Sequence, residues 1–143
     1  MRHIAILGST GSIGTQALDV ISQHPDLFEA TVLTAGSNAD LLIEQARLFH
    51  PATVVIANES RYEQVRDALA DLPIKVFAGA EAICEVVTAD DIDIVLTAMV
   101  GFAGLRPTVW RLPRHRRPSS PWDRIRHVLS DGVPALHCLC RQI

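Results

Sequence analysis

The feature that most constrains the fold is the stretch from Ile4 to Gly14, in which a short apolar run leads into closely spaced glycines. The glycines stand at positions 8, 11 and 14, and an amphipathic helical pattern follows them. A strand that ends in a glycine turn and leads into a helix presents backbone N–H groups at the positive end of the helix dipole. We therefore expect a phosphate-binding turn. The alternative is a tight turn without a ligand, because the spacing Gly-x-x-Gly-x-x-Gly differs from the commoner Gly-x-Gly-x-x-Gly.

Apolar segments alternate with helical segments from the first strand to about Thr97. Residues Ala30–Ala35 are almost all apolar or threonine, which is typical of a parallel strand that helices cover on both faces. Strands are predicted at residues 3–7, 30–35, 53–57, 74–77 and 92–97, and helices at 12–24, 39–49, 60–72 and 79–88. Ser60 and Glu63 are predicted to form a capping box at the third helix. This order predicts an α/β fold with a doubly wound, Rossmann-like parallel sheet.

Composition limits the class of protein. The chain has 143 residues and a formal net charge of −3, which favours a single globular domain and lacks the positive charge of nucleic-acid-binding domains. No apolar run approaches the roughly 18 residues of a membrane-spanning helix, and the first strand begins too early to leave room for a signal peptide. The three cysteines form no disulfide framework. We therefore expect a cytoplasmic protein without a nucleic-acid or membrane partner.

The end of the second strand bears on which dinucleotide would bind. An NAD-binding domain usually places a carboxylate about 20 residues beyond the glycine turn, where it binds the ribose 2′-hydroxyl. Counting on from Gly14 reaches Gly36, Ser37 and Asn38, where no carboxylate stands. Hydroxyl, amide and backbone donors favour a 2′-phosphate, and therefore NADP. The alternative is that Ser37 and Asn38 cap the second helix.

Other residues suited to chemistry have simpler explanations. The run from His137 to Cys140 lacks the Cys-x-x-Cys spacing of a zinc site. Asp90, Asp91 and Asp93 precede a buried strand and are expected to be solvated loop carboxylates. Cys84 lies on the apolar face of the fourth helix and is expected in the core. We therefore predict no metal ligands and no catalytic residues in this chain.

The character of the sequence changes near Arg106. Residues 110–143 hold most of the arginines, half of the histidines and both tryptophans, without a convincing strand or helix period up to Ser120. This segment could be a basic arm for an anionic partner, a disordered tail, or a segment translated out of frame. We favour the third interpretation, because shifted GC-rich codons commonly yield arginine, proline, tryptophan, histidine and cysteine.

Four blocks closely resemble the 1-deoxy-D-xylulose 5-phosphate reductoisomerase family: residues 7–14, 18–20, 35–38 and 98–108. The resemblance implies an NADPH-dependent enzyme of non-mevalonate isoprenoid biosynthesis. The family rearranges and reduces 1-deoxy-D-xylulose 5-phosphate, a phosphorylated sugar, to 2-C-methyl-D-erythritol 4-phosphate with a divalent metal, Mg or Mn, and is homodimeric. The family usually has Lys or Arg where Ser37 stands.

The resemblance also assigns cofactor contacts. Thr10, Gly11, Ser12 and Ile13 would contact the phosphates of NADPH, and Gly36, Ser37 and Asn38 its adenosine ribose. With the outer glycines of the turn, the predicted cofactor-binding set is Gly8, Thr10, Gly11, Ser12, Ile13, Gly14, Gly36, Ser37 and Asn38.

After Thr108 the chain departs from the family, which continues into an Asn-Lys-Glu segment and then the Asp-Ser-Glu metal ligands. We therefore expect an NADP-binding domain at 1–108 and an irregular basic tail at 109–143. The expected function is the NADPH-binding portion of the reductoisomerase, inactive by itself because the metal and substrate residues are missing. The alternative is a non-catalytic, NADP-sensing module whose basic tail contacts a partner.

The out-of-frame interpretation makes a prediction at the level of the gene. One of the other two reading frames beyond codon 108 should encode an Ala-Asn-Lys-Glu-like segment. Resequencing the gene and translating all three frames checks this expectation, and the absence of such a segment from both other frames would contradict it.

Overall fold

A computed structural model describes residues 1–99 of the chain. Strands and helices alternate through this part, as expected from the sequence. The strands are β1 (Arg2–Leu7), β2 (Phe28–Ala35), β3 (Thr53–Ile56), β4 (Lys75–Ala78) and β5 (Ile94–Thr97). The helices are α1 (Ser12–Gln23), α2 (Ala39–Phe49), α3 (Tyr62–Ala68) and α4 (Ala80–Val86), with a 3₁₀ turn, η1 (Glu59–Arg61), before α3.

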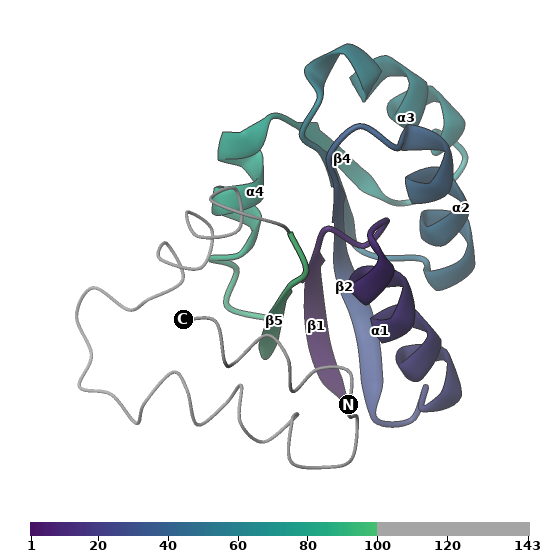
Figure 1. Ribbon diagram of the computed structural model, residues 1–143, viewed down its shortest axis with the longest axis vertical. Coiled ribbons are helices and arrows are strands. Elements are labelled where there is room, and N and C mark those ends of the chain that lie inside the picture. The colour runs from purple at the N-terminus through teal and green to yellow at the C-terminus, as the bar shows by residue number, and fades with distance from the viewer. Residues whose placement is uncertain (100–143) are drawn as a thin grey trace, which may run out of the picture. The chain divides into compact units, whose positions relative to one another are not determined.

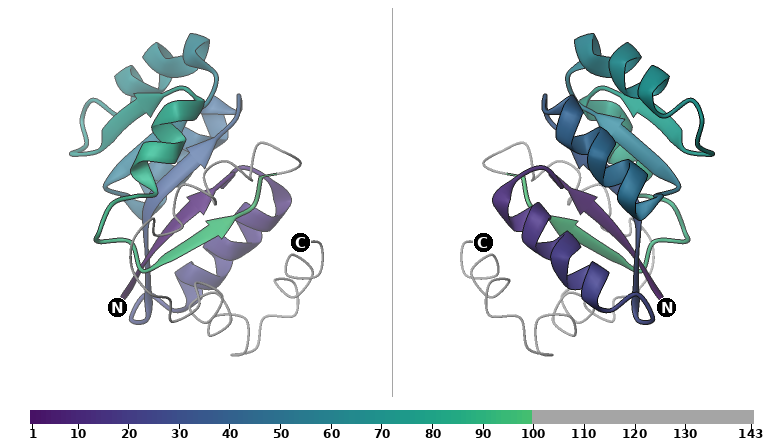
Figure 2. Two further views of the ribbon diagram at one scale, coloured as in Figure 1. Left: turned by 90° about the vertical axis from the view of Figure 1, so that its left-hand side faces the viewer. Right: turned by 90° about the vertical axis from the view of Figure 1, so that its right-hand side faces the viewer.

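The strands form one parallel sheet in the order β4-β3-β2-β1-β5. The chain moves outward from β1 to β4 and then returns past β1 to form β5. Right-handed crossovers therefore put the first helices on one face and the returning helix on the other. Figures 1 and 2 show α1 and α2 on one face, with α3 beside α2, and α4 on the opposite face. The predicted doubly wound α/β fold is confirmed.

The central strands supply the core. Ile6, Leu7, Leu33, Val54 and Val55 are fully buried because helices cover both faces of the sheet. On the α4 face, Ile83 and Val87 pack with Leu7 and Val55. Cys84 is buried on the same helix, as expected from its apolar neighbours.

The start of the third helix differs from the sequence prediction. The cap is not Ser60 with Glu63: the Asn58 side chain accepts a hydrogen bond from Ser60 N at 3.1 Å and another from Ser60 Oγ at 2.6 Å. This cap starts η1, and α3 follows at Tyr62 without a side-chain cap of its own. Asn58 displaces Ser60 as the cap because it lies two residues earlier and its amide oxygen accepts from the N–H group of Ser60 itself.

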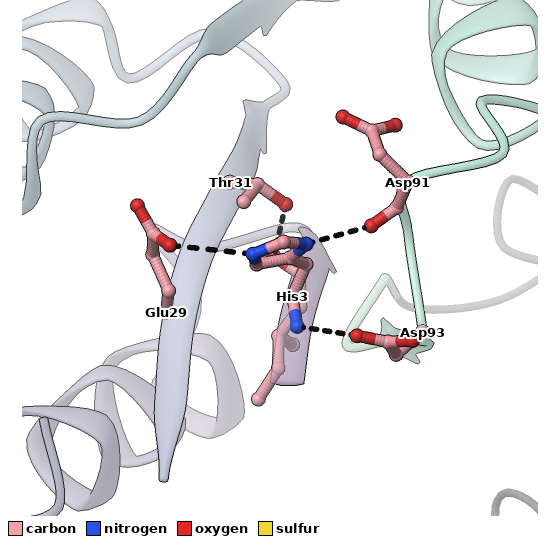
Figure 3. Close-up of polar contacts among 6 residues, drawn as sticks. His3, Glu29, Thr31, Asp91 and Asp93 are labelled. Atoms are coloured by element: carbon pink, nitrogen blue, oxygen red, sulfur yellow. Dashed lines mark hydrogen bonds and ion pairs between the residues drawn. The ribbon is translucent and has the colours of Figure 1, made fainter. Parts of the chain in front are cut away.

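The N-terminal ends of β1 and β5 are joined through His3 (Figure 3). Asp93 Oδ2 accepts a hydrogen bond from His3 N at 2.8 Å, and Asp93 N donates to His3 O at 3.0 Å. The ring of His3 contacts Asp91 O through Nδ1 at 2.9 Å and lies 3.5 Å from Glu29 Oε2 through Nε2. Asp91 and Asp93 are exposed and precede β5, in agreement with the expected solvated loop carboxylates. The Asp93 side chain in addition helps to hold β5 beside β1.

Within residues 1–99, no helix is long and apolar enough to cross a bilayer, and no group of three or more His, Cys, Asp or Glu residues could hold a metal ion. The glycine loop at 100–104, the run from His137 to Cys140 and the expected tail at 109–143 lie outside the described residues.

Replacing Asp93 with Ala should destabilise the protein by about 1 kcal/mol, the usual net contribution of an intramolecular hydrogen bond, because the exposed carboxylate is also hydrated. Asp90→Ala is the matched control, since it removes a nearby exposed carboxylate that makes neither contact with His3. Urea unfolding measures both changes, and equal midpoints for the two variants would contradict the proposed anchoring of β5.

Candidate functional site

The candidate site lies at the C-terminal edge of the sheet, where β1 turns into α1. From β1 the chain winds outward through β2, β3 and β4 on one side, and it then returns to form β5 on the other side of β1. The direction of winding therefore reverses between β1 and β5. Ligands of open α/β sheets bind at such points. Figure 2 shows the ends of β1 and β5 side by side next to the start of α1.

Backbone hydrogen bonds fix the turn to the neighbouring strand. Gly8 N donates to Thr34 O at 3.1 Å and to Thr34 Oγ1 at 3.0 Å, and Ser9 N donates to Thr34 O at 2.8 Å. The end of β2 therefore determines where the turn begins. Gly11 N closes the turn by donating to Gly8 O at 3.2 Å.

A buried polar cluster of Ser9, Thr34 and Gln45 lies behind the turn. Ser9 Oγ donates to Gln45 Oε1 at 2.7 Å, and Gln45 Nε2 donates to Ser9 O at 2.9 Å. Ser9 Oγ also lies 3.2 Å from Thr34 O. The two reciprocal bonds join the turn to α2, so the turn is held by β2 and α2 together.

Two of the three glycines are required by the fold itself. Gly8 has φ +86°, a conformation that side chains rarely adopt, and a Cβ there would lie 3.0 Å from Ala98 O. At Gly14 a Cβ would lie 2.3 Å from Gly8 O and 2.6 Å from Ser9 Cα. The first turn of α1 therefore packs directly on the backbone of the glycine turn.

Gly11 is different. Its φ of −77° and ψ of 172° suit any residue, and a Cβ there would meet Gly8 O at an ordinary 3.5 Å. Gly11 is exposed, and it is the N-cap residue of α1. The fold accordingly leaves room for a side chain at a position where the sequence has none.

The start of α1 is suited to an anion. Thr15 N donates to Gly11 O at 2.9 Å, which begins the helical ladder, so the N–H groups of Ser12, Ile13 and Gly14 have no acceptor within the helix. No side chain caps α1, and no acidic residue lies in its first turn. The other α-helices of residues 1–99 each carry an acidic residue there, namely Asp40, Glu63 and Glu81. Thr10 and Ser12 add hydroxyl groups beside these donors.

The second group of predicted residues lies at the end of β2. Gly36, Ser37 and Asn38 are all exposed, and space around Gly36 is open to 4 Å from its missing Cβ. Asn38 Oδ1 accepts from Leu41 N at 3.3 Å, so Asn38 caps α2 as the alternative interpretation stated. The amide nitrogen of Asn38 remains available to a ligand. Gly36 O accepts from Asn58 N at 2.9 Å, which joins this segment to the end of β3.

Sequence reasoning missed the residues that hold the turn in place. Thr34 lies within an apolar run, and nothing marked it as a hydrogen-bonding residue. Gln45 did carry a signal, because it falls between Leu42 and Ala46 on the apolar stripe of α2, and a polar residue on a buried face needs a partner. The identity of that partner, Ser9, depends on the tertiary structure.

A protein-family model described as 1-deoxy-D-xylulose 5-phosphate reductoisomerase matches residues 4–117 of the chain. The chain belongs to the 1-deoxy-D-xylulose 5-phosphate reductoisomerase family. This membership confirms the resemblance found in the sequence, and it favours a reductoisomerase over a separate NADP-sensing module.

Individual members of the reductoisomerase family agree with this assignment. The enzyme of Bacteroides thetaiotaomicron is 64% identical over 108 residues, which are 76% of this chain and 28% of the relative. That of Porphyromonas gingivalis is 63% identical over the same length and the same shares. The chain therefore spans about 28% of the length of the curated relatives that it matches.

Solved structures of the reductoisomerase family share the fold. That of the Zymomonas mobilis enzyme in complex with NADPH has a TM-score of 0.73 at 34% identity, covering 77% of this chain and 29% of that one. A reductoisomerase in complex with NADPH, fosmidomycin and magnesium has a TM-score of 0.73 at 35% identity, covering 77% of this chain and 27% of that one.

The packing constraint at Gly14, and its absence at Gly36, can be measured as changes in the free energy of unfolding. Gly14→Ala should lower the free energy of unfolding by about 3 kcal/mol or more, because backbone atoms of Gly8 and Ser9 must move to admit the methyl group. Gly36→Ala is the matched control: nothing lies within 4 Å of its Cβ, so its effect should stay within about 0.5 kcal/mol. Urea unfolding of both variants tests this expectation, and similar losses in the two would refute the packing argument.

Proposed function

We propose that residues 1–108 form the NADPH-binding part of a 1-deoxy-D-xylulose 5-phosphate reductoisomerase. The full enzyme would rearrange and reduce 1-deoxy-D-xylulose 5-phosphate to 2-C-methyl-D-erythritol 4-phosphate. The observation that carries the proposal is the start of α1, a helix N-terminus without a side-chain cap or an acidic residue, behind a turn anchored on two sides. Bound NADPH supplies the hydride for the reduction.

The residues of the turn fit a pyrophosphate. The N–H groups of Ser12, Ile13 and Gly14 and the hydroxyl groups of Thr10 and Ser12 supply donors on one side of the turn. Gly11 gives a phosphate close access to the backbone, which explains a glycine where the fold would accept a side chain. Gly8 and Gly14 contribute through the shape of the turn, so their role in binding is indirect.

The adenosine end of the cofactor would lie over Gly36, Ser37 and Asn38. The open space at Gly36 admits a ribose close to the backbone. The Ser37 hydroxyl and the Asn38 amide nitrogen can donate to a 2′-phosphate, and no carboxylate stands in this segment to repel it. These features support NADP over NAD.

The divalent metal and the substrate would be bound by other parts of the full enzyme. We assign no metal ligand to residues 1–99, since no suitable group of side chains occurs there. This chain alone would therefore be inactive.

Residues 109–143 are proposed to be out of frame. The full enzyme is proposed to be a cytoplasmic homodimer.

Replacing Gly11 with Ser separates binding from folding. Serine is a favoured N-cap, so unfolding stability should stay the same or rise by a few tenths of a kcal/mol. The new hydroxyl group would occupy the N–H donors of the first turn and fill the space for a phosphate, so NADPH affinity should fall at least about tenfold, which corresponds to about 1.4 kcal/mol.

Thermal shift with NADPH and NADH measures this on the whole chain, because a ligand that binds the folded state raises its stability by mass action. The wild-type chain should be stabilised more by NADPH than by NADH, and Gly11→Ser should lose most of that gain. A wild-type chain that neither cofactor stabilises would overturn the proposed function.

A further inference from the structure

The cations of the described part are unevenly placed around the sheet. They are Arg2, Arg47, Arg61, Arg66 and Lys75. Arg2 and Lys75 begin strands, and Arg47 and Arg66 lie in the last turns of helices, so these four belong away from the strand ends that carry the glycine turn. Arg61 alone among them follows the C-terminal end of a strand, through η1 after β3.

Backbone hydrogen bonds connect Arg61 to the segment Gly36–Asn38, which is proposed to bind the adenosine end of the cofactor. Asn58 N donates to Gly36 O at 2.9 Å, and Arg61 N donates to Asn58 O at 3.0 Å. The Asn58 side chain holds the intervening turn through Ser60 N at 3.1 Å. Arg61 is therefore fixed one short turn from the residue that binds the end of β2, although it is distant from Ser37 in the sequence.

The charge of Arg61 is not neutralised within residues 1–99. Arg47 forms an ion pair with Asp71 at 3.0 Å, and Arg66 one with Asp67 at 2.9 Å, whose hydrogen bond and charge raise the pKa of Arg66. Arg61 is exposed, and its Nη1 donates to the neutral Gln64 Oε1 at 3.3 Å. Most of its five N–H donors remain free for an anion.

No carboxylate within residues 1–99 forms an ion pair with Arg61. Asp40 Oδ1, in the first turn of α2, accepts from Gln64 Nε2 at 2.6 Å. Gln64 thus bonds to Asp40 through its amide nitrogen and to Arg61 through its amide oxygen, so it links the Arg61 guanidinium to the first turn of α2. Glu59 extends the other way, since its Oε1 lies 3.0 Å from where a Cβ on Gly79 would be, at the end of β4.

We propose that Arg61 binds the 2′-phosphate of NADPH from the end of β3, supplying the cation that Ser37 does not provide at the end of β2. The inference rests on the proposed NADPH-binding function and names the residue that selects the phosphate. A guanidinium forms paired, charge-assisted hydrogen bonds with a phosphate, whereas a serine hydroxyl forms one neutral bond. An arginine near the ribose is a common means by which this kind of domain accepts NADP.

Removing the charge tests the proposal on the full chain. Arg61→Gln should weaken NADPH binding by roughly tenfold to a hundredfold, the loss expected for hydrogen bonds to a charged group, and leave NADH binding unchanged. Arg66→Gln is the matched control, because it removes the same charge from an exposed arginine on the neighbouring helix. Calorimetric titration with NADPH and NADH gives the four affinities, and adenosine 2′,5′-bisphosphate against adenosine 5′-monophosphate isolates the 2′-phosphate.

Arg61→Lys separates phosphate binding from a structural role. It should retain part of the preference for NADPH, and the unfolding temperature of Arg61→Gln without ligand should match that of the wild type. Equal weakening of NADPH and NADH, or no change in either, would overturn the role of Arg61 and leave the proposed NADPH-binding function standing. Equal wild-type affinities for NADPH and NADH would also overturn it, while keeping dinucleotide binding. A wild-type chain that binds neither cofactor would refute both proposals.

Discussion

The site depends on the pair of hydrogen bonds between Ser9 and Gln45. Gln45 Nε2 donates to Ser9 O, which fixes the amide orientation and turns Oε1 toward the Ser9 hydroxyl. Reversing the amide would set two oxygen atoms against each other. A serine hydroxyl has one proton, and the 2.7 Å bond to Gln45 is shorter than the 3.2 Å contact with Thr34 O, so Gln45 receives it. Because both side chains are buried, breaking either bond would leave a polar group without water, at a cost of about 1–3 kcal/mol.

These bonds matter for function because they fix the position of the glycine turn from its interior side. Thr34 and Gln45 belong to β2 and α2, and both approach the turn from the interior, which leaves its outer surface to a ligand. Within residues 1–99 no buried side-chain nitrogen or oxygen lacks a hydrogen-bond partner. Gly11 and Ser12 are exposed, so a ligand can reach the backbone N–H groups at the start of α1 from solvent.

The sequence predicted the order of elements and the doubly wound sheet because the apolar periods are long and proline and glycine separate them. It located the glycine turn for the same local reason. It did not predict that Asn58 rather than Ser60 caps the segment after β3, since both residues are good caps and their choice depends on the backbone bond from Asn58 to Gly36. The proposed role of Arg61 near Ser37 was not predicted, because counting residues along the chain finds only positions that are close in sequence. Pairing of β2 with β3 brings the ends of the two strands together.

The glycines show how the fold and the proposed binding are divided. Gly8 and Gly14 are required by the backbone geometry of the turn, and a side chain at either position would disturb the turn whatever ligand binds. A Cβ at Gly36 would have no atom within 4 Å, and one at Gly11 would make an ordinary 3.5 Å contact with Gly8 O, so the fold does not require glycine at either position. Ser37 and Arg61 are both exposed, and neither is hydrogen-bonded to the cluster of Ser9, Thr34 and Gln45. A change of side chain at 37 therefore breaks no bond of this cluster, and the proposal for Arg61 takes the cation for a 2′-phosphate from another strand end of the same sheet.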